Sequence, residues 1–149
     1  MNKTPDRVAQ RSVELFNRGL CCAESVLQAV AESRGIQSDL IPRIATGLCA
    51  GIARTGGICG AVSGGVLAIS MVTGRRNPEE SREENHRLVR LFLSECEARF
   101  GSTNCEKLIG CRLDTPEGQQ FFKEHNLRVK CAEFTQEAAR LASKAVAGA

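Results

Sequence analysis

The sequence predicts an all-α fold, a single-domain helical bundle of about five main helices with additional short helical turns. Apolar residues recur at helical spacing along most of the chain, and no stretch shows the sustained apolar–polar alternation of a strand. The 149 residues match the size of one domain and can bury a core without disulfides. We therefore expect one domain that spans residues 1–149.

Capping residues, prolines and glycines mark where each helix begins and ends. Thr4 is expected to cap the first helix, with Pro5 at its first position, where a missing N–H costs nothing. Glycines after the apolar stripes act as stops, as Gly19 does for the first helix. In chain order, these signals predict helices that begin at Thr4, near Cys21–Cys22, after Ser38–Asp39, around Cys59, at Glu79, at Cys105, at Thr115 and at about Lys130. The third of these is expected to run to Leu48 and the last to Val146.

Composition argues against two classes of function. Twenty Lys and Arg against seventeen Asp and Glu leave a net charge of +3, which is too weak and too scattered to indicate a nucleic-acid partner. The chain has no Trp and no Tyr, the side chains on which single-stranded bases stack. The longest apolar run, residues 58–73, is shorter than the roughly 20 residues of a membrane span, so we do not expect an integral membrane protein.

The eight cysteines are the most informative feature of the composition. Residues 1–6 contain no apolar segment typical of a secretory signal, so we expect a cytoplasmic protein. In that compartment, cysteines bind metals or take part in redox reactions more often than they form structural disulfides. No C-x-x-C, C-x-x-C-H or G-x-G-x-x-G motif is present, so spacing alone assigns no metal, haem or nucleotide site.

Four cysteines fall in the first turn of a predicted helix: Cys22, Cys59, Cys105 and Cys131. Helix starts carry free N–H groups and a partial positive charge, which lower the pKa of a thiol. If these starts converge at one end of the bundle, four thiolates would share an electropositive pocket. The alternative is that each thiol packs as a small hydrophobic side chain.

The other cysteines and the histidines are weaker candidates. Cys21, Cys49 and Cys96 are expected to pack in the interior, whereas Cys111 follows a glycine and could turn back toward the third of the four cysteines. His125 could act as a base or a ligand, although a surface position is more common for histidine.

Glycines surround Cys59 in the sequence. Gly57, Gly60 and Gly64 are candidate cofactor contacts, because bare backbone can approach a sulfur or a cluster closely. Close packing of helices through small residues explains the same pattern. The small residues from Gly60 to Ala68 would also form a flat surface suited to a homodimer.

Four segments resemble the C-GCAxxG-C-C family. Residues 19–27, Gly-Leu-Cys-Cys-Ala-Glu-Ser-Val-Leu, resemble its Gly-x-x-Cys-Ala opening, and residues 59–64, Cys-Gly-Ala-Val-Ser-Gly, match its Cys-Gly-Ala-x-x-Gly signature. Residues 105–110 and 131–134 resemble its third and fourth cysteine segments, and order and spacing fit from about residue 8 to residue 142.

The resemblance implies a redox-active protein whose four characteristic cysteines are Cys22, Cys59, Cys105 and Cys131. Related cysteine domains are associated with iron–sulfur binding in split-Soret-type cytochromes, so the resemblance is compatible with thiol chemistry and with a cluster. This sequence departs from the family in four additional cysteines, which leave the disulfide pairing open: Cys21, Cys49, Cys96 and Cys111.

Three functions are compatible with this sequence. In the first, Cys59 or Cys22 attacks as a thiolate and a second cysteine resolves the mixed disulfide. In the second, nearly equal in weight, the four characteristic cysteines hold an iron–sulfur cluster or a soft metal. The third is a helical interaction protein with inert thiols. A redox partner protein is expected for the first two, and the sequence does not identify it.

Overall fold

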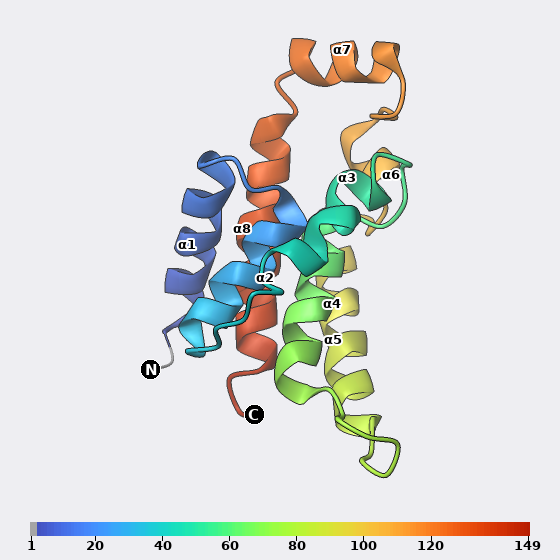
Figure 1. The fold of residues 1–149 in the computed structure, drawn as a ribbon. Coiled ribbons are helices and arrows are strands. Elements are labelled where there is room, and N and C mark those ends of the chain that lie inside the picture. Colours follow the sequence, from blue (N-terminus) through green and yellow to red (C-terminus); the bar gives the residue numbers. More distant parts are fainter. Residues whose placement is uncertain (1–2) are drawn as a thin grey trace.

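The chain folds into a helical bundle with a group of short helices at one end (Figure 1). The computed structural model describes residues 3–149. The long helices are α1 (Pro5–Asn17), α2 (Cys22–Ser33), α4 (Gly60–Thr73), α5 (Glu83–Phe100) and α8 (Arg128–Ala145). The short elements are the 3-10 helix η1 (Arg43–Leu48), α3 (Cys49–Ile52), α6 (Cys105–Ile109) and α7 (Pro116–Glu124). The predicted all-α fold class is confirmed.

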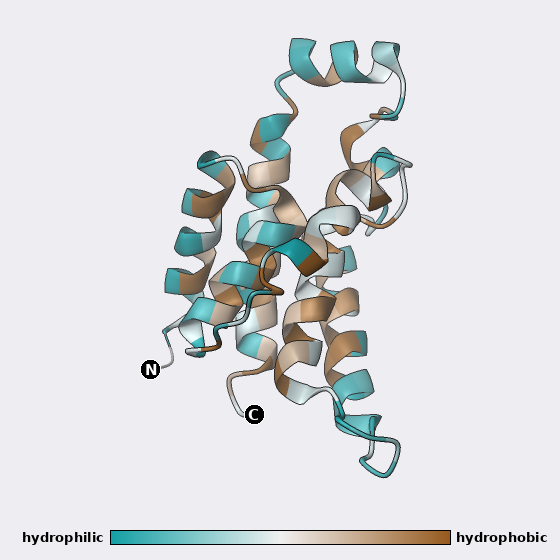
Figure 2. Cartoon of the chain, in the orientation of Figure 1, coloured by the Kyte–Doolittle hydropathy of each residue, from teal (hydrophilic) through white to brown (hydrophobic). Residues whose placement is uncertain are grey.

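Helix α8 packs against all four of the other long helices. The core between them holds large, fully buried side chains such as Phe92, Ile69, Val26 and Val62. Figure 2 shows hydrophobic residues along the sides of helices that face one another, and a hydrophilic loop between α4 and α5. No helix in residues 3–149 is long and apolar enough to span a membrane.

Helix α4 packs closely against its neighbours through glycine. A Cβ added to Gly64 would lie 2.7–2.8 Å from backbone atoms of Ala23 in α2, and one added to Gly65 would collide with the ring of Phe92 in α5. Residues 60–65 and Ala68 are all buried. The flat surface predicted to suit a homodimer is therefore used inside the chain, because α2 and α5 already cover it.

Several predicted helix starts are confirmed in detail. The Thr4 hydroxyl accepts a hydrogen bond from the backbone N–H of Arg7, and Pro5 begins α1. Thr115 caps α7 in the same way through the N–H of Gly118. Side-chain caps thus satisfy donors that have no partner inside the helix.

The third predicted helix is a 3-10 helix rather than an α-helix. Within the predicted segment, residues 43–48 form the 3-10 helix η1 and residues 39–42 form a turn. The apolar side chains of Leu40 and Ile44 are 57% and 54% exposed. Ala45 is buried and Ile41 and Leu48 pack against the core, but Leu40 and Ile44 face solvent. The segment therefore lacks the continuous buried face that stabilises a longer α-helix.

Helix α5 begins at Glu83 rather than at the predicted Glu79. The side chain of Asn77 accepts hydrogen bonds from the N–H groups of Glu79 and Glu80, and the Ser81 hydroxyl accepts one from Glu83. These local bonds compete with a helical turn for the same backbone donors.

Replacing Gly64 with alanine tests the contact between α2 and α4. We expect a loss of about 1–3 kcal/mol of unfolding free energy, because the new methyl group overlaps the backbone of Ala23. Urea unfolding of Gly64→Ala measures it. Gly47→Ala is the matched control, since nothing lies within 4 Å of its added Cβ. Equal stability of the two variants would contradict the close packing.

Candidate cysteine site

Helices α2, α4 and α8 begin at the same end of the bundle, where α3 and α6 also lie (Figure 1). A cavity of about 500 Å³ lies between these starts. Six cysteines line it: Cys21, Cys22, Cys49, Cys59, Cys105 and Cys131. The structure therefore brings the four cysteines of the predicted site to one cavity, together with two that were expected to be inert.

Each of the four occupies the start of a different helix. Cys22 is the first residue of α2 and Cys105 the first of α6, Cys59 caps α4, and Cys131 lies in the first turn of α8.

Two backbone hydrogen bonds fix Cys59 relative to Cys105. The N–H of Cys59 donates to the carbonyl of Thr103, and the N–H of Cys105 donates to the carbonyl of Gly57, both at 2.7 Å. The two helix starts are therefore linked through main-chain atoms, which fixes the backbone of both cysteines at the cavity.

Glycine allows the backbone to approach two of these sulfurs. A Cβ on Gly60 would collide with the sulfur of Cys22, and a Cβ on Gly51 would lie 3.2 Å from the sulfur of Cys105. Of the three predicted glycine contacts, Gly60 lines the cavity. Gly57 donates its N–H to the carbonyl of Gly51, and Gly64 serves helix packing.

Burial reverses the expected effect of the helix starts on the thiols. Burial raises the pKa of Cys59 to about 12, and the neighbouring Cys22 and Cys105 add to the rise, while the N–H groups of Val62 and Ala61 oppose it. Burial also raises the pKa of Cys22. The expectation of a low-pKa thiolate is thus wrong, because desolvation outweighs the partial charge of the helix start.

The thiols also act on one another. Burial raises the pKa of Cys131 to about 12, with further contributions from Cys22, Cys59 and Cys105. Burial and the charges of Cys22, Cys111 and Glu106 raise the pKa of Cys105 to about 11. At neutral pH these thiols are protonated in the protein without a bound cation.

Arg128 brings a positive charge to this end of the bundle. Its guanidinium donates to the carbonyl of Phe16 at 2.8 Å and lies 4.0 Å from the centre of the Phe16 ring. It opposes the rise in the pKa of Cys131. The remaining cavity wall is largely apolar and includes Phe122 and Phe134.

Cys21 and Cys49 form a disulfide, with their Cα atoms 5.9 Å apart. The expectation that both pack as inert apolar residues is therefore wrong. Cys21 precedes α2 as its cap, and Cys49 begins α3, so the disulfide joins the two elements at the cavity wall. No spacing motif marks this pair, since 28 residues separate them.

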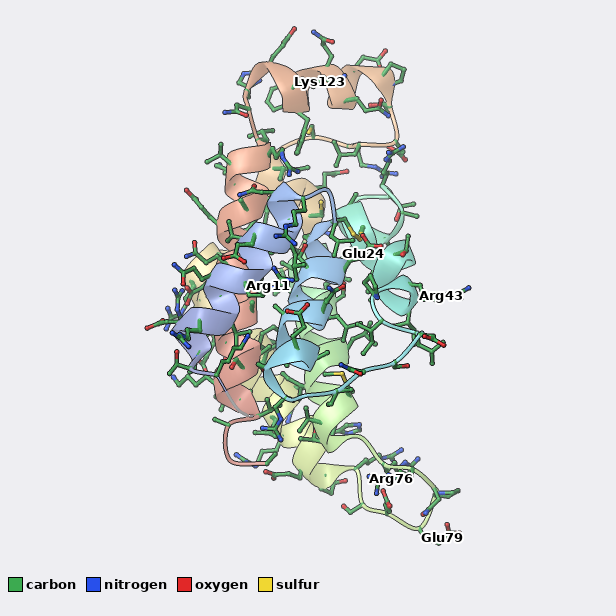
Figure 3. The ribbon with its side chains drawn as sticks, turned by 60° about the vertical axis from the view of Figure 1, so that its left-hand side comes forward. Arg11, Glu24, Arg43, Arg76, Glu79 and Lys123 are labelled. Carbon is green, nitrogen blue, oxygen red and sulfur yellow. A yellow bond between two sulfur atoms is a disulfide. The ribbon has the colours of Figure 1, made fainter. Side chains whose placement is uncertain are left out.

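Glu24 is a further residue of the site that the sequence did not indicate. One carboxylate oxygen accepts from the N–H of Cys21 at 2.9 Å, and the other accepts from the hydroxyl of Thr46 at 2.6 Å. Figure 3 shows Glu24 between α2 and the short helices η1 and α3. Its position three residues after Cys21 is the spacing of a capping box, which is the available sequence signal.

The segment after Cys49 has an unusual backbone. Five successive residues, 50–54, have φ between 51° and 72°. Only one of them is glycine, and each of the others is disfavoured in this region by about 1–2 kcal/mol. Ala50, Ala53 and Arg54 line the cavity. A left-handed turn therefore forms part of the wall over the thiols.

The remaining candidates lie outside the cavity lining. Cys96 is fully buried in the core, as predicted, and Cys111 packs against the small apolar cluster that contains Cys105. His125 is exposed, stacks on Phe121, and ends α7. Its predicted role as a base or ligand is not supported by this position.

Fold and site define a helical protein with a cysteine-lined cavity at its helix starts. The family described as "Putative redox-active protein (C_GCAxxG_C_C)" matches residues 20–145. The chain belongs to this family.

A similar protein occurs in Archaeoglobus fulgidus, where it is described as an uncharacterized protein. The two are 32% identical over 81 residues, which is 54% of each chain. The chain thus spans about half the length of this curated relative. No solved structure matches the chain.

The raised thiol pKa values predict that the reduced protein is sensitive to alkali. A thiol that keeps its proton to about pH 12 when folded, but to about pH 8.5 when unfolded, contributes stability that is complete below the lower pKa. That stability is lost as the pH rises, by about 1.4 kcal/mol per pH unit for each thiol.

Urea unfolding between pH 7 and pH 10.5 measures this loss. Cys59→Ala should reduce the slope of stability against pH, whereas Ser94→Ala, at an exposed position, should leave it unchanged. A slope that does not change in Cys59→Ala would contradict the raised pKa of this thiol.

Proposed function

We propose that this redox-family protein carries an iron–sulfur cluster, or another soft-metal centre, whose ligands are Cys22, Cys59, Cys105 and Cys131. The observation that carries the proposal is the presence of four free thiols, from four helix starts, in one cavity. Thiolates are the preferred ligands of iron–sulfur clusters and soft metals.

The electrostatics of the cavity favour a bound cation over a free thiolate. Each of the four thiols has a raised pKa, so none is poised as a nucleophile at neutral pH. A metal centre deprotonates its thiol ligands and neutralises their mutual repulsion. The repulsion between thiolates that keeps these thiols protonated is therefore offset when they bind a metal.

The spacing of the sulfurs favours a cluster over a single ion. A tetrahedral ion with metal–sulfur bonds of about 2.3 Å holds its ligand sulfurs about 3.8 Å apart. Within residues 3–149, no three of these four thiols lie within 4.8 Å of one another. A cluster of several irons spans more space and accepts ligands that are farther apart.

The backbone around the sulfurs suits such a group. Glycine at positions 51 and 60 keeps Cβ atoms away from Cys105 and Cys22, and the N–H groups of Ala50, Ala23 and Ala61 lie toward the Cys22 sulfur. Hydrogen bonds to ligand sulfurs and exclusion of water both tune a cluster's potential. A bound cluster would supply one-electron transfer.

Thiol–disulfide cycling is the second candidate, and the Cys21–Cys49 disulfide favours it. This disulfide shares the cavity with four free thiols, and Cys22 follows Cys21 directly in the chain. Exchange would require a thiolate at Cys22 or Cys59, which the raised pKa values make scarce at neutral pH.

Absorption of protein purified without air tests the cluster. Because the chain has no Trp and no Tyr, the protein alone absorbs almost nothing at 280 nm. We expect a band between about 300 and 450 nm from sulfur-to-metal charge transfer, with matching iron and sulfide content.

Replacing a proposed ligand should abolish that band. Cys59→Ser should lose it, whereas Cys111→Ser, a half-buried cysteine outside the cavity lining, should retain it. Colourless protein without metal or sulfide, under strictly anaerobic purification, would refute the cluster.

Counting free thiols tests the second candidate. The oxidised chain has six free thiols and one disulfide, so full reduction should give eight. If the cavity thiols cycle, a mild disulfide oxidant should lower the count below six by a further two per chain, and Cys59→Ser should prevent that additional loss. A count that stays at six in the folded protein would argue against cycling by the cavity thiols.

A further inference from the structure

We infer that Cys21, Glu24 and Cys49 form a second metal site, separate from the four-thiol site, which binds a borderline-soft divalent cation such as Zn²⁺ when the Cys21–Cys49 disulfide is reduced. Within residues 3–149, these are the three residues whose candidate ligand atoms all lie within 4.8 Å of one another. All three are half-buried, which leaves the site accessible to an ion.

The donor set suits zinc. Two thiolates and one carboxylate are common zinc ligands, with bonds of about 2.3 Å to sulfur and about 2.0–2.2 Å to oxygen. Three anionic ligands leave a net charge of −1 around the divalent ion. Three protein ligands also leave a fourth position open, and Cys21 and Cys49 both line the cavity.

The carboxylate is already held in place by the two elements that carry the thiols. The N–H of Cys21 binds one oxygen of Glu24, and the hydroxyl of Thr46, three residues before Cys49, binds the other. Hydrogen bonds of this kind orient metal ligands and reduce the ordering cost of binding. The side-chain hydrogen bond between Glu24 and Thr46 links α2 to η1 without using either sulfur, so it can keep the two thiols close when the disulfide is broken.

The redox step balances with a thiol reductant. A dithiol transfers two electrons and two protons to the disulfide, which gives the thiols of Cys21 and Cys49 and a cyclic disulfide on the reductant. Zn²⁺ binding then displaces the two thiol protons, while Glu24 binds as the carboxylate. Reoxidation by a disulfide oxidant removes two electrons from the two thiolates, reforms the Cys21–Cys49 bond and releases the ion.

The inference does not depend on the cluster proposal, because the two sites share no residue. They are nevertheless neighbours, since Cys21 caps α2 and Cys22 begins it. A test must therefore remove zinc binding by the four-thiol site before it measures the second site.

Zinc binding to a Cys59→Ser/Cys131→Ser background isolates the second site. After anaerobic reduction and removal of the reductant, we expect this full-length variant to bind one Zn²⁺ per chain, measured by competition with a chromogenic chelator. Further replacement of Cys21 and Cys49 by serine should abolish binding, and Glu24→Gln should weaken it at least tenfold. The oxidised background, with its disulfide intact, should not bind.

Controls distinguish loss of a ligand from loss of the fold. Circular dichroism reports whether each variant keeps its helices, and Cys111→Ser on the same background should bind zinc normally. If the background does not fold, reduced wild-type protein should bind one Zn²⁺ more than its Cys21→Ser/Cys49→Ser variant.

Two results would overturn the inference. One is the absence of zinc binding by the reduced, folded background. The other is binding that neither Glu24→Gln nor removal of Cys21 and Cys49 changes. Neither result bears on the absorption band of wild-type protein, so failure of this site and failure of the cluster proposal can be told apart.

Discussion

The close approach of α2 and α4 is the constraint on which the rest of the structure depends. Gly64 brings the backbone of α4 against Ala23, and Gly60 lets the start of α4 reach the sulfur of Cys22. The same contact buries the apolar side of α4 and places Cys59 beside Cys22. Core packing and the cysteine site therefore depend on the same contact, and a side chain at either glycine would disturb both.

The sulfur chemistry of the cavity follows from a competition between two physical effects. Helix starts stabilise thiolates, but these four thiols are themselves buried. Desolvation and repulsion among neighbouring thiolates outweigh the partial charge of the helix starts. The pKa of Cys59 is raised to about 12. This cysteine, expected to be a nucleophile, is therefore a protonated thiol at neutral pH. The same burial that suppresses attack by a free thiolate makes a bound cation more favourable.

Much of the fold could be predicted from the sequence, because its signals are local. Thr4, Pro5 and Thr115 specify helix starts through contacts within four residues. The prediction of a third α-helix failed because helical apolar spacing does not guarantee burial: Ile44 finds no partner in the core. The grouping of the four cysteines could be anticipated from their positions at helix starts. The sign of their pKa shifts could not, because it depends on burial between segments distant in sequence.

The left-handed turn at residues 50–54 makes one wall of the cavity different from the others. Its alanines, isoleucine and arginine hold a conformation that is disfavoured for side chains with a Cβ, while the surrounding bundle is regular helix. Opening this wall relieves that strain, so local unfolding here requires less free energy than unfolding of the bundle. A fluctuation of these few residues would open a route for ions and reductants to the sulfurs of the cavity while α2, α4 and α8 remain folded.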